Sequence, residues 1–257
     1  MIGVFGGTFD PIHYGHLRAA LDVHQALALR ELRFMPLKVA VHREQPRASA
    51  AQRRAMVEAA VAGEPGFRVD DRELMRAGRS FSVDTLTSLR AELDGNRPIC
   101  LLVGGDAFNG FFEWHRPRDI LELAHLVVMQ RPGAAIQHDP RLRAEVQRRR
   151  ATRRHELEQT AAGRIWFESV TQLDISSTGI RRLFAQGRSP RFLLPDAVIE
   201  IARQCGCYAA PAAHAEARTS GDDGRAVRRR PTDPPVFWSE SAPSDRVDSK
   251  TANPEGT

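Results

Sequence analysis

Short hydrophobic runs alternate along this chain with longer stretches in which hydrophobic and polar positions recur at helical spacing. The short runs are rich in valine, isoleucine, leucine and phenylalanine, which is typical of buried strands. They predict strands at residues 2–5, 32–35, 67–70, 99–103, 126–129 and 165–168. The periodic stretches predict helices at residues 15–28, 50–62, 82–93, 142–157, 177–186 and 196–204, with further helical sequence between the fourth and fifth strands.

Strands that alternate with helices favour a parallel sheet that is covered on both faces. Because crossovers between parallel strands are right-handed, the expected fold class is α/β, a doubly wound, Rossmann-like parallel sheet with helices on both faces. Ligands of such sheets bind beyond the carboxyl ends of the strands. We therefore expect the functional residues in the loops that follow the strands.

The last part of the chain lacks this pattern. From about residue 211 it is rich in alanine, serine, aspartate, arginine and proline, and its few hydrophobic residues are scattered. A chain of this composition cannot bury enough apolar surface to fold by itself. We expect one folded domain over residues 1–208 and a disordered Pro/Arg/Ser/Asp-rich tail over residues 209–257.

Charge and cysteine content narrow the function class only slightly. The chain has 37 Lys and Arg against 32 Asp and Glu, a formal net charge of +5, which suits a nucleic-acid partner or phosphorylated substrates equally well. No hydrophobic run approaches the ~20 residues that cross a bilayer, and the N-terminus has no signal-peptide pattern. Three cysteines cannot make a disulfide framework. These features predict a cytoplasmic protein without a membrane partner.

The loop after the first predicted strand has the sequence GGTFDPIHYGH, residues 6–16. Paired glycines let the backbone approach a ligand closely. His13 and His16 are three residues apart at the start of a helix, so they lie on the same side of its first turn. The helix N-terminus adds unpaired N–H groups and positive potential, a combination that suits a polyphosphate. A helix-capping histidine, or a zinc pair with a third ligand from elsewhere, are the alternative interpretations.

A second polar string, ISSTGIR at residues 175–181, follows the last predicted strand and begins a helix. Ser176 or Ser177 alone would be explained as a helix N-cap. Three consecutive hydroxyl side chains, with Arg181 one turn further on, exceed what a cap requires. Hydroxyl, backbone and guanidinium donors together suit terminal phosphate oxygens.

The two strings resemble the (H/T)xGH and ISSTxIR motifs of the nucleotidylyltransferase superfamily. From residue 1 to about residue 208 the chain is similar to the bacterial nicotinate-nucleotide adenylyltransferases. The resemblance implies adenylyl transfer from ATP to nicotinate mononucleotide, giving deamido-NAD and pyrophosphate in NAD biosynthesis. It implies Mg²⁺ bound through the ATP phosphates and no metal site made of protein ligands. Nucleic acid is not an expected partner.

The resemblance also assigns roles to residues. The catalytic group would be His13, His16 and Arg181. The ATP-binding group would be Gly6, Gly7, Thr8, Phe9, Gly104, Asp106, Arg131, Ser176, Ser177 and Thr178. The group that binds the acceptor would be His42, Arg43, Phe81, Ser82, Thr85 and Trp114, with backbone donors on the nicotinate carboxylate and the indole stacked on the pyridine ring.

The chain departs from the family pattern at two places in the acceptor loops. Ala40 and Val41 stand where the family has prolines, and Phe81 and Ser82 stand where it has tyrosine and threonine. Three alternatives therefore stay open: an adenylyltransferase for nicotinamide mononucleotide or phosphopantetheine, a cytidylyltransferase, and a basic nucleic-acid-binding module. The last would use the arginine-rich helical stretch at residues 148–154 and the tail.

Overall fold

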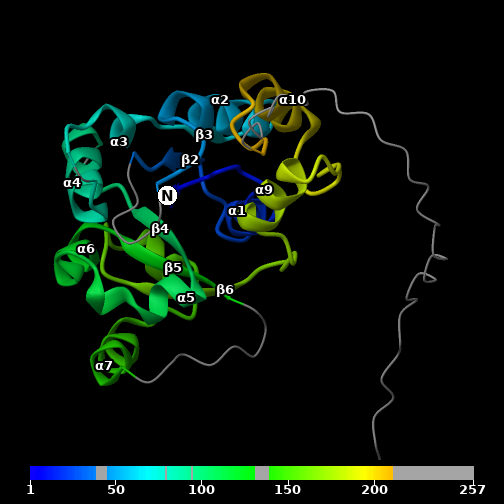
Figure 1. Ribbon diagram of the computed structural model, residues 1–257. Helices are drawn as coiled ribbons and strands as arrows, with labels where there is room; N and C mark the ends of the chain where they lie inside the picture. Colours follow the sequence, from blue (N-terminus) through cyan, green and yellow to red (C-terminus); the bar gives the residue numbers. More distant parts are fainter. Residues whose placement is uncertain (39–44, 79, 94, 131–138, 211–257) are drawn as a thin grey trace, which may run out of the picture. The chain divides into compact units, whose positions relative to one another are not determined.

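The computed structural model describes residues 1–38, 45–78, 80–93, 95–130 and 139–210 (Figure 1). Six strands form one sheet in the order β3-β2-β1-β4-β5-β6. All neighbouring strands are parallel, which confirms the predicted fold class. The strands are β1 (Ile2–Gly7), β2 (Glu31–Pro36), β3 (Phe67–Val69), β4 (Ile99–Gly104), β5 (His125–Gln130) and β6 (Ile165–Ser169). The expected tail lies, from residue 211 on, outside the described residues, so the tail and the domain boundary stay predictions.

Helices connect the strands and cover both faces of the sheet (Figure 1). Because successive strand residues point to opposite faces, Phe5 and Leu102 pack in one core with α1, α2, α9 and α10, whereas Val4 and Leu101 pack in the other with α4, α6 and α7. The helices are α1 (Tyr14–Ala26), α2 (Ala50–Val61), α3 (Arg72–Met75), α4 (Ser82–Glu92), α5 (Gly105–Asn109), the 3-10 helix η1 (Phe111–Glu113), α6 (Pro117–Leu123), α7 (Pro140–Arg149), α8 (His155–Glu158), α9 (Ser177–Ala185) and α10 (Asp196–Cys205).

The predicted helix over residues 142–157 is wrong, because the structure divides it into α7 and α8. Between them the backbone N–H of Ala151 donates to the carbonyl oxygen of Ile165 at 2.9 Å. The chain therefore pairs with the start of β6 at this point and leaves the helix. The Glu156 carboxylate accepts from the backbone N–H groups of Thr152 and Arg153 at 3.0 and 2.9 Å. These bonds satisfy backbone donors just before α8 and so help to start this second helix.

Two further features complete the description of the fold. Cys205 and Cys207, which are two residues apart in the sequence, form a disulfide that the sequence did not lead us to expect. Cys100 is a free, buried cysteine. Within the described part of the chain, no helix combines the length and the hydrophobicity that a bilayer span requires.

A buried histidine ties β5 to the segment before β6. The His125 ring accepts from the Arg164 backbone N–H through Nδ1 at 3.0 Å. Its Nε2 therefore carries the hydrogen and donates to the carbonyl oxygens of Leu157 and Thr160 at 3.0 and 2.9 Å. Burial lowers the pKa of His125 from 6.5 to about 4, so the folded protein holds this ring neutral.

This depressed pKa predicts a pH-dependent stability. Between pH 6.5 and pH 4 the unfolded chain binds a proton at His125 that the folded chain does not, so the free energy of unfolding falls as the pH falls through this window. The loss reaches roughly 3 kcal/mol from this residue alone. His125→Gln keeps an acceptor and a donor but does not titrate, so urea midpoints at pH 7 and pH 5 should differ less in the variant than in the parent. Equal differences would contradict this account.

Candidate active site

The site lies where the strand order reverses. β1 and β4 are neighbours at the middle of the sheet, and the chain continues from them toward opposite edges. In open α/β sheets this point leaves a crevice beyond the carboxyl ends of the two strands. The loop that begins at Gly6 and the turn that begins at Gly104 both start here, so the fold brings together the two strand ends that the sequence singled out.

The two glycines of the first loop have different functions in the structure. A Cβ at Gly6 would meet nothing within 4 Å, whereas a Cβ at Gly7 would lie 2.7 Å from the Phe9 ring. Gly6 thus leaves room for a ligand, as expected. At position 7 a glycine is needed for another reason, because the Phe9 ring occupies the place of a side chain. The Phe9 side chain is buried and packs edge-on against His16, with ring centroids 5.2 Å apart. The Phe9 ring therefore supports His16. That Phe9 contacts ATP stays a prediction, and its buried ring leaves only the backbone for such a contact.

The two histidines stack at the start of α1. Their ring centroids are 3.8 Å apart, and the backbone N–H of His13 donates to Nδ1 of His16 at 3.3 Å. In the neutral His16 ring, Nε2 then carries the hydrogen and is the group that can donate to an anion. Burial lowers the pKa of His13 to about 4, so His13 is neutral at pH 7. Among the described residues, none forms a hydrogen bond with its buried Nδ1.

The two motifs are in contact near Gly15, which also leaves room for the His13 ring. A Cβ at Gly15 would lie 3.0 Å from the His13 ring and 3.6 Å from the carbonyl oxygen of Ile175. The Ser177 hydroxyl donates to the carbonyl oxygen of Pro11 at 2.9 Å. The first turn of α1 and the start of α9 therefore lie side by side, although more than 150 residues separate them in the sequence.

Hydroxyl and guanidinium groups gather at the start of α9. The Ser176 Oγ accepts from the Gly179 backbone N–H at 3.1 Å, which is the expected N-cap. Arg181 donates to Thr178 Oγ1 at 3.1 Å and to the carbonyl oxygen of Asp10 at 2.8 Å. The Ser176 and Thr178 side chains are exposed. This arrangement presents hydroxyl groups and one positive charge next to the two imidazoles.

The remaining residues expected for ATP divide into three groups. Gly104 ends β4, and a Cβ there would meet nothing within 4 Å, while Asp106 is exposed in the first turn of α5. Both are placed to face a ligand beyond the sheet. Thr8 contributes its carbonyl oxygen to a bond with Arg53 at 2.7 Å. Arg131 lies outside the described residues.

Aromatic side chains meet where the acceptor is expected to bind. The ring of Phe81, which precedes α4, lies 4.4 Å from the ring of His115. Trp114 is half-buried, and its ring lies 5.6 Å from that of Phe111. The start of α4, with Ser82, is thus next to the segment that carries Trp114. The contact of His115 with Phe81 was not expected from the sequence. His42 and Arg43 lie outside the described residues.

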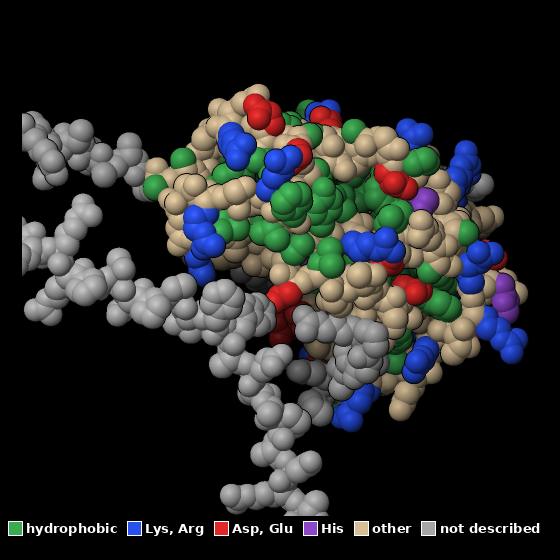
Figure 2. All heavy atoms as spheres, turned by 90° about the vertical axis from the view of Figure 1, so that its right-hand side faces the viewer, with side chains coloured by type: hydrophobic (Ala, Val, Ile, Leu, Met, Phe, Trp, Pro, Cys, Tyr) green, Lys and Arg blue, Asp and Glu red, His purple; other side chains and the backbone are tan. Residues whose placement is uncertain are grey.

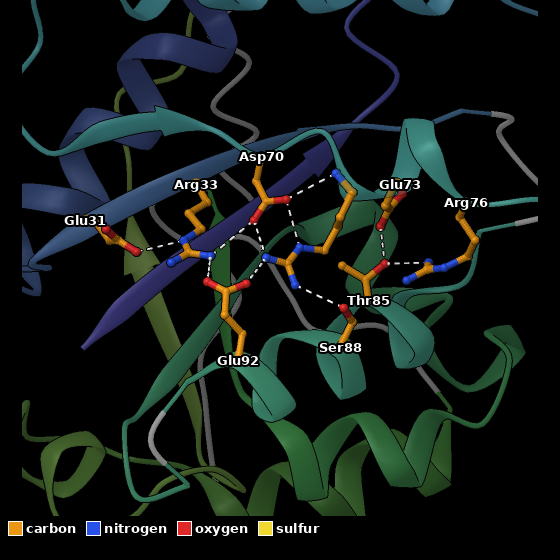
Figure 3. Close-up of polar contacts among 9 residues, drawn as sticks. Glu31, Arg33, Asp70, Glu73, Arg76, Thr85, Ser88 and Glu92 are labelled. Carbon is orange, nitrogen blue, oxygen red and sulfur yellow. Dashed lines mark hydrogen bonds and ion pairs between the residues drawn. The ribbon is translucent and has the colours of Figure 1, made fainter.

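The Thr85 side chain forms hydrogen bonds within the protein. Its buried hydroxyl donates to Glu73 Oε1 at 2.6 Å and accepts from Arg76 at 3.0 Å (Figure 3). The Thr85 hydroxyl therefore supports the start of α4, and a role of Thr85 in binding the acceptor stays a prediction. Burial raises the pKa of the Glu73 carboxyl.

An ion-pair network holds α4 against the sheet. The Asp70 carboxylate accepts from Arg33 at 3.2 Å and from Arg72 at 2.7 Å, and both arginines also bind Glu92 of α4 (Figure 3). These contacts join β2, the end of β3 and α4. They fix the helix at whose N-terminus the acceptor is expected.

Three arginines of the segment at residues 148–154 form ion pairs with carboxylates. Arg148 and Arg149 both pair with Glu145 of their own helix, and Arg154 pairs with Glu158. On the face that Figure 2 shows, positive and negative side chains are interspersed around a hydrophobic centre. This distribution gives the nucleic-acid interpretation no continuous basic surface on that face.

Similarity to known proteins agrees with this geometry. The family model described as Cytidylyltransferase-like matches residues 4–183. A probable nicotinate-nucleotide adenylyltransferase of Methylococcus capsulatus is 50% identical over 210 residues, covering 81% of this chain and 100% of that protein. The protein of the same name from Halorhodospira halophila is also 50% identical over 210 residues, covering 82% and 96%.

Solved structures agree with the fold. The nicotinic acid mononucleotide adenylyltransferase of Plasmodium falciparum, complexed with NaAD, matches with a TM-score of 0.60 at 15% identity, covering 80% of this chain and 96% of that one. At this identity the match concerns the fold alone. Together with the sequence relatives it leads to one conclusion: the chain belongs to the nicotinate-nucleotide adenylyltransferase family of cytidylyltransferase-like proteins.

Proposed function

We propose that this protein transfers the adenylyl group of ATP to nicotinate mononucleotide, giving deamido-NAD and pyrophosphate as a step of NAD biosynthesis. The observation that carries the proposal is the contact between the two motifs, through Ser177 to Pro11 and Arg181 to Asp10. Such a contact makes one cradle for a triphosphate out of two distant segments. The names of the relatives at 50% identity support the choice of acceptor.

The reaction needs positioning and charge stabilisation more than a protein nucleophile. A phosphate oxygen of the mononucleotide attacks the α-phosphorus of ATP, and the bond to the pyrophosphate oxygen breaks. That phosphate is already anionic at pH 7, so no strong base is required. His13 and His16 would donate to the α-phosphate.

The leaving group would be held at the start of α9. Ser176 and Thr178 offer exposed hydroxyl groups, and Arg181 offers a guanidinium that matches phosphate oxygens in geometry and charge, whereas the Ser177 hydroxyl holds Pro11 and so joins the two motifs. Pyrophosphate gains negative charge as the bond breaks, so donors fixed in advance at this end stabilise the transition state.

A divalent cation, expected to be Mg²⁺, would arrive on the phosphates of ATP and neutralise part of their charge. Hard cations prefer phosphate oxygens and water, which fits this manner of binding. Among the residues that the structure describes, no group of three or more His, Cys, Asp or Glu side chains is arranged to hold a metal ion. The expected cytoplasmic location stays a prediction.

The acceptor would lie between the start of α4 and Trp114. Trp114→Ala should raise the KM for nicotinate mononucleotide about tenfold and leave the KM for ATP nearly unchanged, because a lost stacking partner costs on the order of 1 kcal/mol or more. Phe112, which also precedes α6 and is half-buried, gives the matched control Phe112→Ala. Equal effects of both variants on the two KM values would contradict an acceptor role for Trp114.

Pyrophosphate release with ATP and one candidate acceptor at a time tests the function itself. We expect release with nicotinate mononucleotide, and slower or no release with nicotinamide mononucleotide, phosphopantetheine or no acceptor. Faster release with another acceptor would replace the proposed substrate. RNA binding that is salt-sensitive and survives loss of His13 and His16 would favour the nucleic-acid alternative.

A further inference from the structure

Asp10, within the first loop, is a junction of four parts of the chain. Its buried carboxylate accepts from the backbone N–H groups of Arg47 and Ala48 at 2.9 and 3.0 Å. It also accepts from the hydroxyl of Tyr208, 198 positions later in the sequence, at 2.7 Å. Arg181 of α9 donates to the Asp10 carbonyl oxygen at 2.8 Å. A loop that only connected a strand to a helix would need none of these distant partners.

Arg53 of α2 ties down the same loop from the other side. Its side chain is 1% exposed. Its guanidinium donates to the carbonyl oxygen of Thr8 at 2.7 Å, to that of Ala48 at 3.3 Å and to that of Lys38 at 3.4 Å. An arginine stays charged even when burial lowers its pKa, as it does here. The buried Asp10 carboxylate lies 3.8 Å from the Arg181 guanidinium and also interacts electrostatically with the charge of Arg53.

Stability alone is a weak reason for such an arrangement. Buried ionic groups cost desolvation energy, and well-packed apolar side chains of similar volume often stabilise a fold as well or better. What a fully bonded polar network provides is fixed geometry. Here the fixed atoms are the backbone of the loop that ends in His13 and the guanidinium of Arg181.

We propose that Asp10, Arg53 and Tyr208 are positioning residues that hold the histidine loop in register with Arg181 and with the segment after β2. The inference rests on the proposed function, since it concerns the alignment of the groups assigned to ATP. Lys38 precedes and Arg47 follows residues 39–44, which include His42 and Arg43, expected at the acceptor phosphate. The network thus joins the ATP side of the site to the chain on both sides of that segment.

Arg90 offers a matched control. It is also an arginine whose pKa is lowered by burial, and it donates to the carbonyl oxygens of Leu123, Arg97 and Ala161 at 2.9, 2.6 and 2.6 Å. These partners precede β5, β4 and β6, so Arg90 lies at the amino ends of the strands, away from the site. Arg53→Met and Arg90→Met each remove a comparable set of bonds to backbone carbonyls.

The test is steady-state kinetics in which kcat is expressed per ATP-binding site, so that misfolded protein does not count. For Arg53→Met we expect kcat about 10²-fold lower and the KM for ATP several-fold higher, since a shift of about 1 Å in reacting groups can cost this much. Arg53→Lys should recover part of the loss. Tyr208→Phe, which removes only the hydroxyl, should lower kcat about tenfold. Arg90→Met should lose stability but keep kcat and KM within about two-fold.

The possible outcomes distinguish a failure of the proposed function from a failure of the positioning role. Parent protein that releases no pyrophosphate would overturn the proposed function. An active parent, with Arg53→Lys and Tyr208→Phe both unchanged in kcat and KM, would overturn the positioning role alone, and these milder variants answer the question even where Arg53→Met does not fold. The same kinetic losses in Arg90→Met would also overturn it, because the effect would then follow stability and not position.

Discussion

Replacement of His16 by alanine is expected to lower kcat by about 10²-fold or more, the scale of losing one preorganised donor to the transition state. The His13 backbone N–H bonds to Nδ1 of His16, so the hydrogen of the neutral ring is on Nε2, the atom that we propose donates to the α-phosphate. The ring is only half-buried, so its removal should not unfold the protein. Turnover at saturating ATP and nicotinate mononucleotide, with circular dichroism as a check on folding, measures the effect.

His155→Ala is the control for this variant. His155 is exposed at the start of α8 and lies outside both motifs, so its loss should change kcat by less than about two-fold, as for most surface substitutions. If His16→Ala and His155→Ala have similar turnover, His16 has no part in the mechanism.

The second large effect is expected for Arg181→Met, with kcat/KM lower by about 10²- to 10³-fold. The guanidinium is held by Asp10 and Thr178, which aims it at the start of α9 where the leaving pyrophosphate would lie. Because it would bind the phosphates before and during the reaction, the KM for ATP should rise as kcat falls.

The neighbouring Arg182 supplies the comparison. It follows Arg181 on α9 but is exposed, so Arg182→Met removes the same charge without removing a group from the cradle. Initial rates over a range of ATP concentrations measure both variants. Equal kcat/KM values for the two would mean that net charge, and not the place of Arg181, accounts for the activity.

Local sequence patterns were sufficient to predict the sheet and most helices. The buried runs that became β1, β4 and β5 are continuous and hydrophobic because a parallel sheet is covered on both faces. The break between α7 and α8 could not be predicted this way, since it depends on Ala151 pairing with β6, a tertiary contact within a charged stretch that has helical periodicity.

The same distinction applies to the site. The string at residues 6–16 and the hydroxyl groups of residues 176–178 were recognisable because their residue types are unusual for their positions. The contacts of Thr85 with Glu73 and of Tyr208 with Asp10 were not, because a buried partner far away in sequence leaves no mark on the local pattern. Supporting residues therefore had to come from the structure.

ATP radiolabelled at either the α- or the γ-phosphate tests most directly whether the cradle directs attack to the α-phosphorus. With nicotinate mononucleotide as acceptor, the account predicts that the α-label appears in the dinucleotide and the γ-label in pyrophosphate. Appearance of the γ-label on the acceptor would contradict it, because the site would then transfer a terminal phosphoryl group.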